Sequence, residues 1–169
     1  KLTIIPRTQE ALAKYENPGN LGPQDLLQQA IMNDSVEDIK KAIQAGANVN
    51  ALLGTQPLLL LAVLTGKYKA AQELLNNGAN PNIYHANQPL VIFLIKQANF
   101  DFALKLLNTA VNLSPNEKND AIDYILYSST YPVNSTYVDV LKKLGYEIKN
   151  NFESKNLLKN KWYNLLVKH

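Results

Sequence analysis

Residues 44–50 read Gln-Ala-Gly-Ala-Asn-Val-Asn, and the pattern returns at residues 76–82 as Asn-Asn-Gly-Ala-Asn-Pro-Asn. We call the shift from Gly46 to Gly78 the repeat step. Two further landmarks keep this step: Gln56-Pro57-Leu58 returns as Gln88-Pro89-Leu90, and Leu74-Leu75 returns as Leu106-Leu107. A fixed period of this size is typical of proteins built from stacked supersecondary units. We therefore expect such a stack, and stacks of this kind generally serve as binding surfaces.

Within each unit, apolar residues recur at the spacing of two successive amphipathic helices. Gly46, Gly66 and Gly78 stand where these helices should end, in the left-handed conformation that glycine adopts easily. A fourth unit is degenerate, with an insertion of about three residues near 131–133 before Gly145, judged by the repeat step. The predicted helices cover residues 26–31, 36–43, 58–65, 68–75, 90–97, 100–107, 121–128 and a segment around 138–141.

This pattern predicts three regions. Residues 1–23 form an N-terminal extension with a short helix over 8–15, where Thr8 is the N-cap. Residues 24–149 hold the repeats, divided at about 24–50, 51–82, 83–114 and 115–149. Residues 150–169 form a C-terminal capping helix with an apolar stripe that includes Trp162. A single pair of short helices cannot hide its apolar stripe, so the units must stack.

Composition excludes several classes of function. The chain has no cysteine, which excludes disulfides, thiolate metal sites and cysteine nucleophiles. No apolar run approaches the length of a membrane span. The formal charge of +3 is mild, and Arg7 is the only arginine, so bidentate phosphate or base recognition is nearly absent. Because the chain begins at Lys1, we expect a processed form or a part of a longer chain.

The repeated motifs resemble the ankyrin repeat, whose pattern runs roughly Gly-x-Thr-Pro-Leu-His-x-Ala-Ala-x-x-Gly and later Leu-Leu-x-x-Gly-Ala-x-x-Asn. The best copy here is residues 56–82, and the first copy keeps Gly46-Ala47-Asn48-Val49-Asn50. The resemblance covers about residues 24–149. It implies an all-α fold: an ankyrin-repeat solenoid of stacked helix-turn-helix units with short finger loops and capping helices.

The chain departs from this family at the fingers that connect the units. The usual Thr-Pro-Leu-His appears as Gln-Pro-Leu-Leu or Gln-Pro-Leu-Val, so the Thr and His that hydrogen-bond across the finger are missing. The repeat step is also one position shorter than the usual period of the family. We therefore expect irregular loops rather than β-hairpins between the units.

No catalytic constellation is present in the sequence. His85 and His169 are the only histidines, and no nucleophile elbow, His-Glu-x-x-His helix or glycine-rich phosphate loop occurs. Asp120 and Asp123 lie one helical turn apart, but near a helix start they would mainly favour its dipole. We expect no catalytic residues, no metal and no cofactor.

The resemblance implies that a partner protein binds the concave face, which consists of the fingers and the exposed side of each first helix. Carried over residue by residue, the candidate positions are Met32, Leu52, Leu53, Gln56, Leu64, Thr65, Tyr84, His85, Asn87, Gln88 and Lys96. The same positions of the units extend this set to Asn33, Gln97, Asn116, Glu117, Asp120, Ser128 and Ser129.

Several of these candidates are apolar where a solvent-exposed surface would be polar. Leu52, Leu53 and Tyr84 on the fingers, with Met32 and Leu64 on the helices, would line adjacent units, and contiguous exposed apolar surface marks an interaction site. The alternative is that Leu52 and Leu53 pack against Leu21 or the N-terminal extension, which would leave no open patch.

The leading interpretation is a non-enzymatic protein–protein interaction module, expected to be a monomer with no membrane partner. Its divergent repeats and 21 asparagines make it similar to ankyrin proteins of intracellular bacteria, which often act as effectors on host proteins. That similarity implies a cytoplasmic location, or secretion into a host cell.

A second interpretation is a regulatory or substrate-recruiting part of a larger enzyme. A third, nucleic-acid binding, rests on the lysines between Lys142 and His169 and would be salt-dependent.

Overall fold

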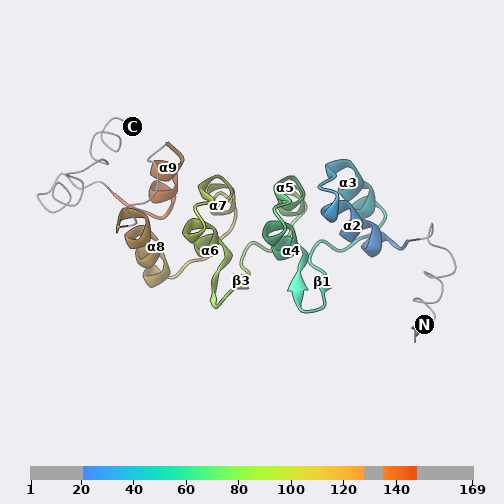
Figure 1. Ribbon diagram of the computed structural model, residues 1–169, viewed down its shortest axis with the longest axis horizontal. Coiled ribbons are helices and arrows are strands. Elements are labelled where there is room, and N and C mark those ends of the chain that lie inside the picture. Colours follow the sequence, from blue (N-terminus) through green and yellow to red (C-terminus); the bar gives the residue numbers. More distant parts are fainter. Residues whose placement is uncertain (1–20, 128–134, 148–169) are drawn as a thin grey trace, which may run out of the picture. The chain divides into compact units, whose positions relative to one another are not determined.

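The computed structural model describes residues 21–127 and 135–147, and the chain there is mostly helical. It divides into two compact units, Lys1–Ala79 and Asn80–His169. Within the described residues, each unit holds two helix pairs and one short β-hairpin (Figure 1). The predicted helix over 8–15, the insertion near 131–133 and the capping helix over 150–169 lie outside the described residues.

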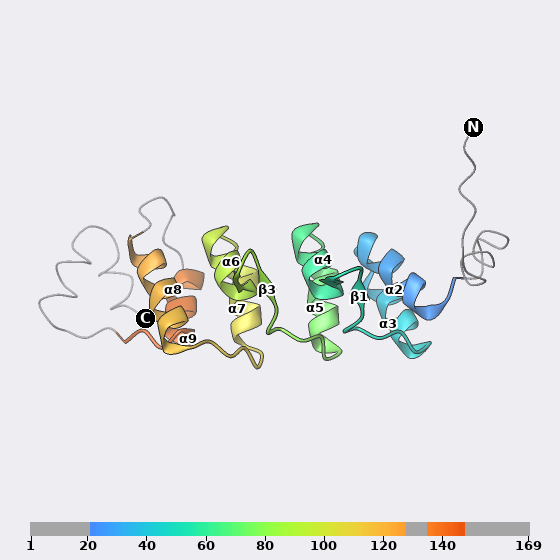
Figure 2. The same ribbon diagram turned by 90° about the horizontal axis from the view of Figure 1, so that it is seen from below.

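The first unit contains helices α2 (Pro23–Met32), α3 (Val36–Gln44), α4 (Leu58–Leu64) and α5 (Tyr68–Asn76). Successive helices of a pair are joined by three-residue turns, and α2 lies beside α3 as α4 lies beside α5 (Figure 2). The first pair packs on the second, because α3 contacts α5 and α2 contacts both α4 and α5. The largest fully buried side chains of this unit are Leu27, Ile31, Ile39, Leu58, Leu59 and Leu74.

The second unit contains α6 (Leu90–Lys96), α7 (Phe100–Leu107), α8 (Pro115–Tyr127) and α9 (Ser135–Lys143). Helix α7 packs on α9 and α6 packs on α8. The rings of Phe100 and Tyr137 stack at the contact between α7 and α9, with centroids 3.8 Å apart. Its largest fully buried side chains are Leu90, Leu94, Ile95, Leu106, Ile125 and Leu141.

Left-handed residues end the helices at regular intervals. In the turn between the helices of a pair, Asp34, Gly66 and Ala98 have φ of 53°, 70° and 59°, and they are separated by exact repeat steps. The next residue then donates its N–H to the fifth carbonyl back, as Lys67 does to Ala62 at 2.8 Å. This bond satisfies a carbonyl that the helix leaves unpaired. The predicted left-handed conformation of Gly46 and Gly78, with φ of 100° and 87°, is confirmed.

Polar side chains begin the second helices. Ser35 accepts a hydrogen bond from the Asp38 N–H at the start of α3, at 3.3 Å. Lys67 gives α5 no such cap. Instead, the Asp34 carboxylate accepts from the Ala70 N–H at 2.8 Å, although the two residues are 36 positions apart. The turn of the first pair therefore caps a helix of the second pair and holds the two pairs in register.

The fingers are β-hairpins, so the expectation of irregular loops was wrong. Strand β1 (Leu52–Leu53) pairs antiparallel with β2 (Gln56–Pro57), and β3 (Tyr84–His85) pairs with β4 (Gln88–Pro89). Each hairpin closes with a two-residue turn that contains left-handed residues: Gly54 at φ 63° in the first, Ala86 at 51° and Asn87 at 59° in the second. Such turns match the right-handed twist of paired strands. The shortened finger therefore closes without the family's Thr and His.

Helix α8 begins six residues earlier than the predicted start at residue 121. Ser114 Oγ accepts from the Glu117 N–H at 3.2 Å, while Glu117 Oε2 accepts from the Ser114 N–H at 2.7 Å. This reciprocal arrangement is a capping box, and Pro115 is favourable at the first helical position. Asn116 and Glu117, which the ankyrin resemblance places at the finger position of the third junction, therefore lie in the first turn of a helix. Asp120 and Asp123 lie further along this helix instead of near its start.

The Asn-x-Asn motif connects elements along the chain. Asn50 donates to the Gly78 carbonyl at 3.0 Å, and Asn82, one repeat step later, donates to the Ala110 carbonyl at 2.8 Å. The first asparagine of each motif accepts the N–H of the second, at 2.9 Å in both copies. These hydrogen bonds give the motif a structural role in both units.

Candidate partner-binding surface

Four large apolar side chains of the first unit are exposed at the predicted binding positions. We call Met32, Leu52, Leu53 and Leu64 the apolar surface. Their exposed fractions are 48%, 57%, 44% and 41%. Met32 and Leu64 are the last residues of α2 and α4, which contact each other, and the two finger leucines form strand β1. Because α4 has only seven residues, about 10 Å of helix separates the finger from Leu64.

The polar neighbours of this surface supply little hydrogen bonding to a ligand. Thr65 is exposed, but its hydroxyl donates to the Leu61 carbonyl at 2.7 Å. Gln56 is half-buried on strand β2. Residues 51–66 contain no Asp, Glu, Lys, Arg or His. The chemistry offered by residues 51–66 is therefore largely apolar and uncharged.

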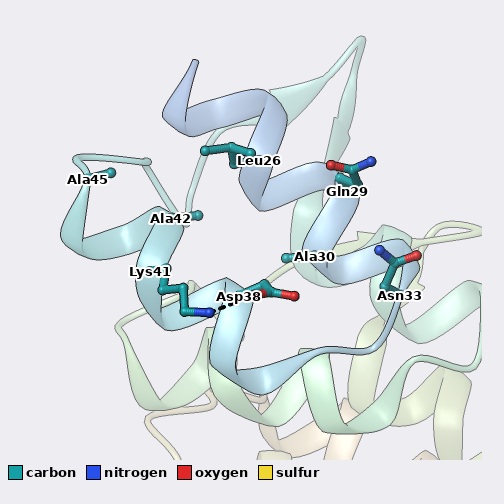
Figure 3. Close-up of a pocket in the computed structure, with 8 residues that line it drawn as sticks. All are labelled: Leu26, Gln29, Ala30, Asn33, Asp38, Lys41, Ala42 and Ala45. Atoms are coloured by element: carbon teal, nitrogen blue, oxygen red, sulfur yellow. Dashed lines mark hydrogen bonds and ion pairs between the residues drawn. The ribbon is translucent and has the colours of Figure 1, made fainter. Parts of the chain in front are cut away.

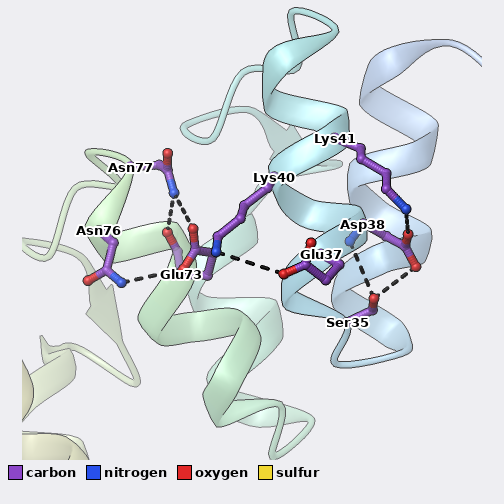
Figure 4. A network of polar contacts seen from close by, with 8 residues as sticks. All are labelled: Ser35, Glu37, Asp38, Lys40, Lys41, Glu73, Asn76 and Asn77. Atoms are coloured by element: carbon purple, nitrogen blue, oxygen red, sulfur yellow. Dashed lines mark hydrogen bonds and ion pairs between the residues drawn. The ribbon is translucent and has the colours of Figure 1, made fainter.

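Charged groups of this unit lie instead on α3 and α5; those of α3 pair with one another, while Glu73 of α5 accepts hydrogen bonds from Asn76 and Asn77 (Figure 4). Lys41 Nζ lies 3.2 Å from Asp38 Oδ1, and Lys40 Nζ lies 4.0 Å from Glu37 Oε1. The Ser35 hydroxyl donates to Asp38 at 2.8 Å, and this bond, followed by the contact with Lys41, holds the pKa of Asp38 below its ordinary value of 3.8. The second helices therefore carry a solvated polar face, while the first helices and the finger carry the apolar one.

In the second unit, the structure joins Tyr84 of the finger to α8. Tyr84 is 60% exposed, and its hydroxyl donates to Glu117 Oε1 at 3.3 Å. The negative charge of Glu117 raises the pKa of Tyr84 above 10.0. The hydrogen bond from the Ser114 backbone, followed by that from its hydroxyl, lowers the pKa of Glu117 below its ordinary value of 4.5. The aromatic ring is thereby held beside the helix.

Lys96 at the end of α6 meets the finger and α8. Its Nζ donates to Gln88 Oε1 at 2.9 Å and lies 5.9 Å from the centre of the Tyr124 ring, within range of a cation–π contact. The Tyr124 hydroxyl in turn donates to the Lys96 carbonyl at 3.3 Å. Sequence reasoning missed Tyr124, because it treated α8 as a degenerate repeat. The sequence signal that could have identified Tyr124 is its spacing from Tyr127, one helical turn further along the predicted helix.

The remaining predicted positions are distributed as follows. His85 is half-buried, and its ring meets the ring of Phe93 edge-on, with the two centroids 4.7 Å apart. His85 therefore supports the finger. Leu52 and Leu53 are both exposed, which gives no support to the alternative that they pack against Leu21. The N-terminal extension, the other part of that alternative, lies outside the described residues. Ser128 and Ser129 also lie outside them. The other predicted positions, all exposed, are Asn33, Asn87, Gln97, Asn116 and Asp120.

Few features of the described residues suggest other chemistry. They contain no group of three or more His, Asp or Glu side chains that could hold a metal ion. None of their helices is long and apolar enough to cross a membrane. Asp120 and Asp123 are both exposed on α8. Of the C-terminal lysines, Lys142 and Lys143 lie at the exposed end of α9, and the others lie outside the described residues.

Comparison with known proteins gives no match: no family model, no curated protein and no solved structure matches this chain.

Proposed function

We propose that this chain is a non-enzymatic module that binds another protein, built as a divergent ankyrin-type stack of helix pairs. The observation that carries the proposal is the apolar surface of Met32, Leu52, Leu53 and Leu64. Monomeric proteins rarely leave several large apolar side chains exposed together unless they contact a partner. Their placement at the ends of first helices and on a finger is the placement that the ankyrin resemblance implies for a binding face.

The partner of this surface presents apolar side chains. Fully burying an exposed leucine contributes about 1.5–3 kcal/mol. Because Leu52 and Leu53 are 57% and 44% exposed, covering both would contribute roughly the value of one such side chain. Residues 51–66 carry no charge that could attract a charged ligand. Binding to the first unit should therefore depend only weakly on salt, in contrast to binding through exposed ion pairs.

The second unit supports the proposal with a different chemistry. Tyr84, Lys96 and Tyr124 combine aromatic rings with a charged group, and tyrosine is enriched at the centres of protein interfaces. The bonds that join Tyr84 to Glu117 and Lys96 to Gln88 fix these side chains before a partner arrives. Such preorganisation reduces the entropy cost of binding.

A display library of random peptides tests the proposal with a defined probe. The wild-type chain should enrich peptides rich in large apolar side chains. The double variant Leu53→Asp with Tyr84→Ala should bind the enriched peptides at least about tenfold more weakly, since a buried unpaired carboxylate is costly and a hot-spot ring is lost.

The matched control is Gln44→Asp, which adds the same charge at an exposed position of α3. It should bind as the wild type does, and circular dichroism should show equal helicity in all three proteins. Equal binding by the double variant, or no enrichment by the wild type, would contradict the proposal.

A further inference from the structure

The end of helix α5 holds the only Asn-Gly pair of the sequence, Asn77-Gly78. Asn77 is the C-cap residue and is exposed, and Gly78 follows it with φ of 87°. Glycine lets its backbone nitrogen come close to the preceding side chain, because it has no side chain of its own to hinder the approach. Asparagine is also one of the thermolabile residues, so this pair combines a reactive side chain with an accessible nucleophile.

The fold restrains both groups of this pair. The Asn77 side-chain nitrogen donates to the Glu73 carbonyl at 2.8 Å and to Glu73 Oε1 at 2.9 Å (Figure 4). The Gly78 N–H donates to the Leu75 carbonyl at 3.1 Å. These bonds hold the Asn77 amide against the preceding turn of α5 and keep the Gly78 nitrogen engaged at the helix end.

We propose that Asn77 is a site of spontaneous deamidation and that the Glu73 side chain controls its rate. When the last turn of α5 opens, the Gly78 nitrogen loses its proton to solvent and attacks Cγ of Asn77. The side-chain amide leaves as ammonia, which gives a cyclic imide. Water then opens one of the two carbonyl–nitrogen bonds of that ring and yields either aspartate or isoaspartate. Water is the co-reactant, and no oxidant or reductant takes part.

The product fits the end of α5 poorly. A carboxylate oxygen replaces the donating nitrogen of Asn77, and it would face Glu73 Oε1 and the Glu73 carbonyl, which are both acceptors. A negative charge at the C-terminal end of a helix is also unfavourable for the helix dipole. Isoaspartate lengthens the main chain just before Gly78, whose carbonyl accepts from Asn50 at 3.0 Å. The modification therefore loosens the end of α5 and its bond to the first finger's approach.

The first helix pair shows that the fold does not require asparagine at this place. One repeat step before Asn77 lies Ala45, the C-cap residue of α3, which lines a pocket between α2 and α3 (Figure 3). The Gly46 N–H donates to the Ile43 carbonyl at 2.9 Å, as Gly78 does to Leu75. Asn77→Ala is therefore a matched control, because it removes the reactive side chain and reproduces a helix end that the chain already contains.

Peptide mapping by mass spectrometry tests the proposal on the full chain, incubated at mildly alkaline pH either folded in buffer or unfolded in urea. Aspartate and isoaspartate at position 77 should form at least about tenfold faster in the unfolded chain, because the folded helix end opens only transiently. In the folded state, Glu73→Ala should react at least about threefold faster than the wild type, since a hydrogen bond to the Asn77 amide is lost. Alanine is the better helix former, so this variant does not weaken α5 through helix propensity.

A second control separates local opening from unfolding of the whole unit. Ser35→Ala removes the N-cap of α3 and should leave the rate at position 77 within about twofold of the wild type. Acceleration in Ser35→Ala as large as in Glu73→Ala would overturn the proposal. Equal rates in the folded wild type and Glu73→Ala, or in the folded and unfolded wild type, would also overturn it. Product that persists in Asn77→Ala would assign the reaction to Asn76 instead. Circular dichroism before incubation confirms that each variant is folded.

Discussion

At the scale of single residues, one carboxylate organises the polar part of the candidate surface. Glu117 accepts from the Ser114 N–H at 2.7 Å and from its hydroxyl at 2.8 Å through one oxygen, and from Tyr84 through the other. It thereby starts α8 and positions the aromatic ring of the finger. The sequence Ser-Pro-Asn-Glu at 114–117 carries the capping-box signature, so this role could have been predicted from the sequence. The contact with Tyr84 could not, because it joins residues 33 positions apart.

Glu117 should make stability depend on acid pH. Its pKa in the folded chain lies below the ordinary 4.5, so its contribution is complete above about pH 4.5 and is lost as the pH falls through the lowered folded pKa. The denaturation midpoint of the wild type should therefore drop further between about pH 6 and pH 3 than that of Glu117→Gln, which has no carboxylate to titrate at this site. Parallel pH profiles for the two proteins would show that the capping box contributes nothing measurable.

At the scale of elements, the turns inside the helix pairs offer a matched comparison. Gly66 and Ala98 occupy the same left-handed position one repeat step apart, and a Cβ placed on Gly66 would meet no atom within 4 Å. Any cost of a side chain there is therefore conformational and not steric. Left-handed backbone disfavours alanine, while the freedom of glycine in the unfolded chain offsets part of this difference.

Two reciprocal substitutions should therefore change stability in opposite directions. Gly66→Ala should lower the free energy of unfolding by about 1 kcal/mol, and Ala98→Gly should raise it by about 0.5–1 kcal/mol. Urea denaturation of the full chain, followed by circular dichroism, measures both. A gain of stability in Gly66→Ala, or a loss in Ala98→Gly, would mean that the turn concerned is not held in the left-handed conformation.

Helices were more predictable from the sequence than the connections between them. The apolar runs at 58–65 and 90–97 predict α4 and α6 to within one residue, because a short buried helix needs nearly continuous apolar residues. The hairpins were not predicted because the expectation of irregular loops relied on the absence of the Thr and His of the ankyrin pattern. The two-residue turns depend instead on Gly54 and on Ala86-Asn87. An Ala in a left-handed turn carries almost no sequence signal, so the second hairpin could not be found in this way.

At the scale of the whole molecule, the two units expose different chemistry on the surfaces proposed to bind a partner. The first unit offers uncharged leucine and methionine side chains, and the second offers tyrosines with Lys96 and Glu117. The candidate positions on the first unit follow from the repeat step and the ankyrin resemblance, and their role in binding stays a prediction. Their exposure could not be predicted, since the same leucines could have been covered. Only the folded chain shows Leu52 to be 57% exposed.

The central claim is that the apolar surface binds a partner protein, and one NMR titration tests it most directly. The chain contains a single methionine, Met32, so a chain labelled with ¹³C at the methionine methyl group gives one signal from this surface. Adding a peptide enriched by the wild type should shift that signal until it saturates, and Leu53→Asp should weaken the fitted affinity at least about tenfold. A Met32 signal that stays unchanged at peptide concentrations that saturate binding would contradict the account.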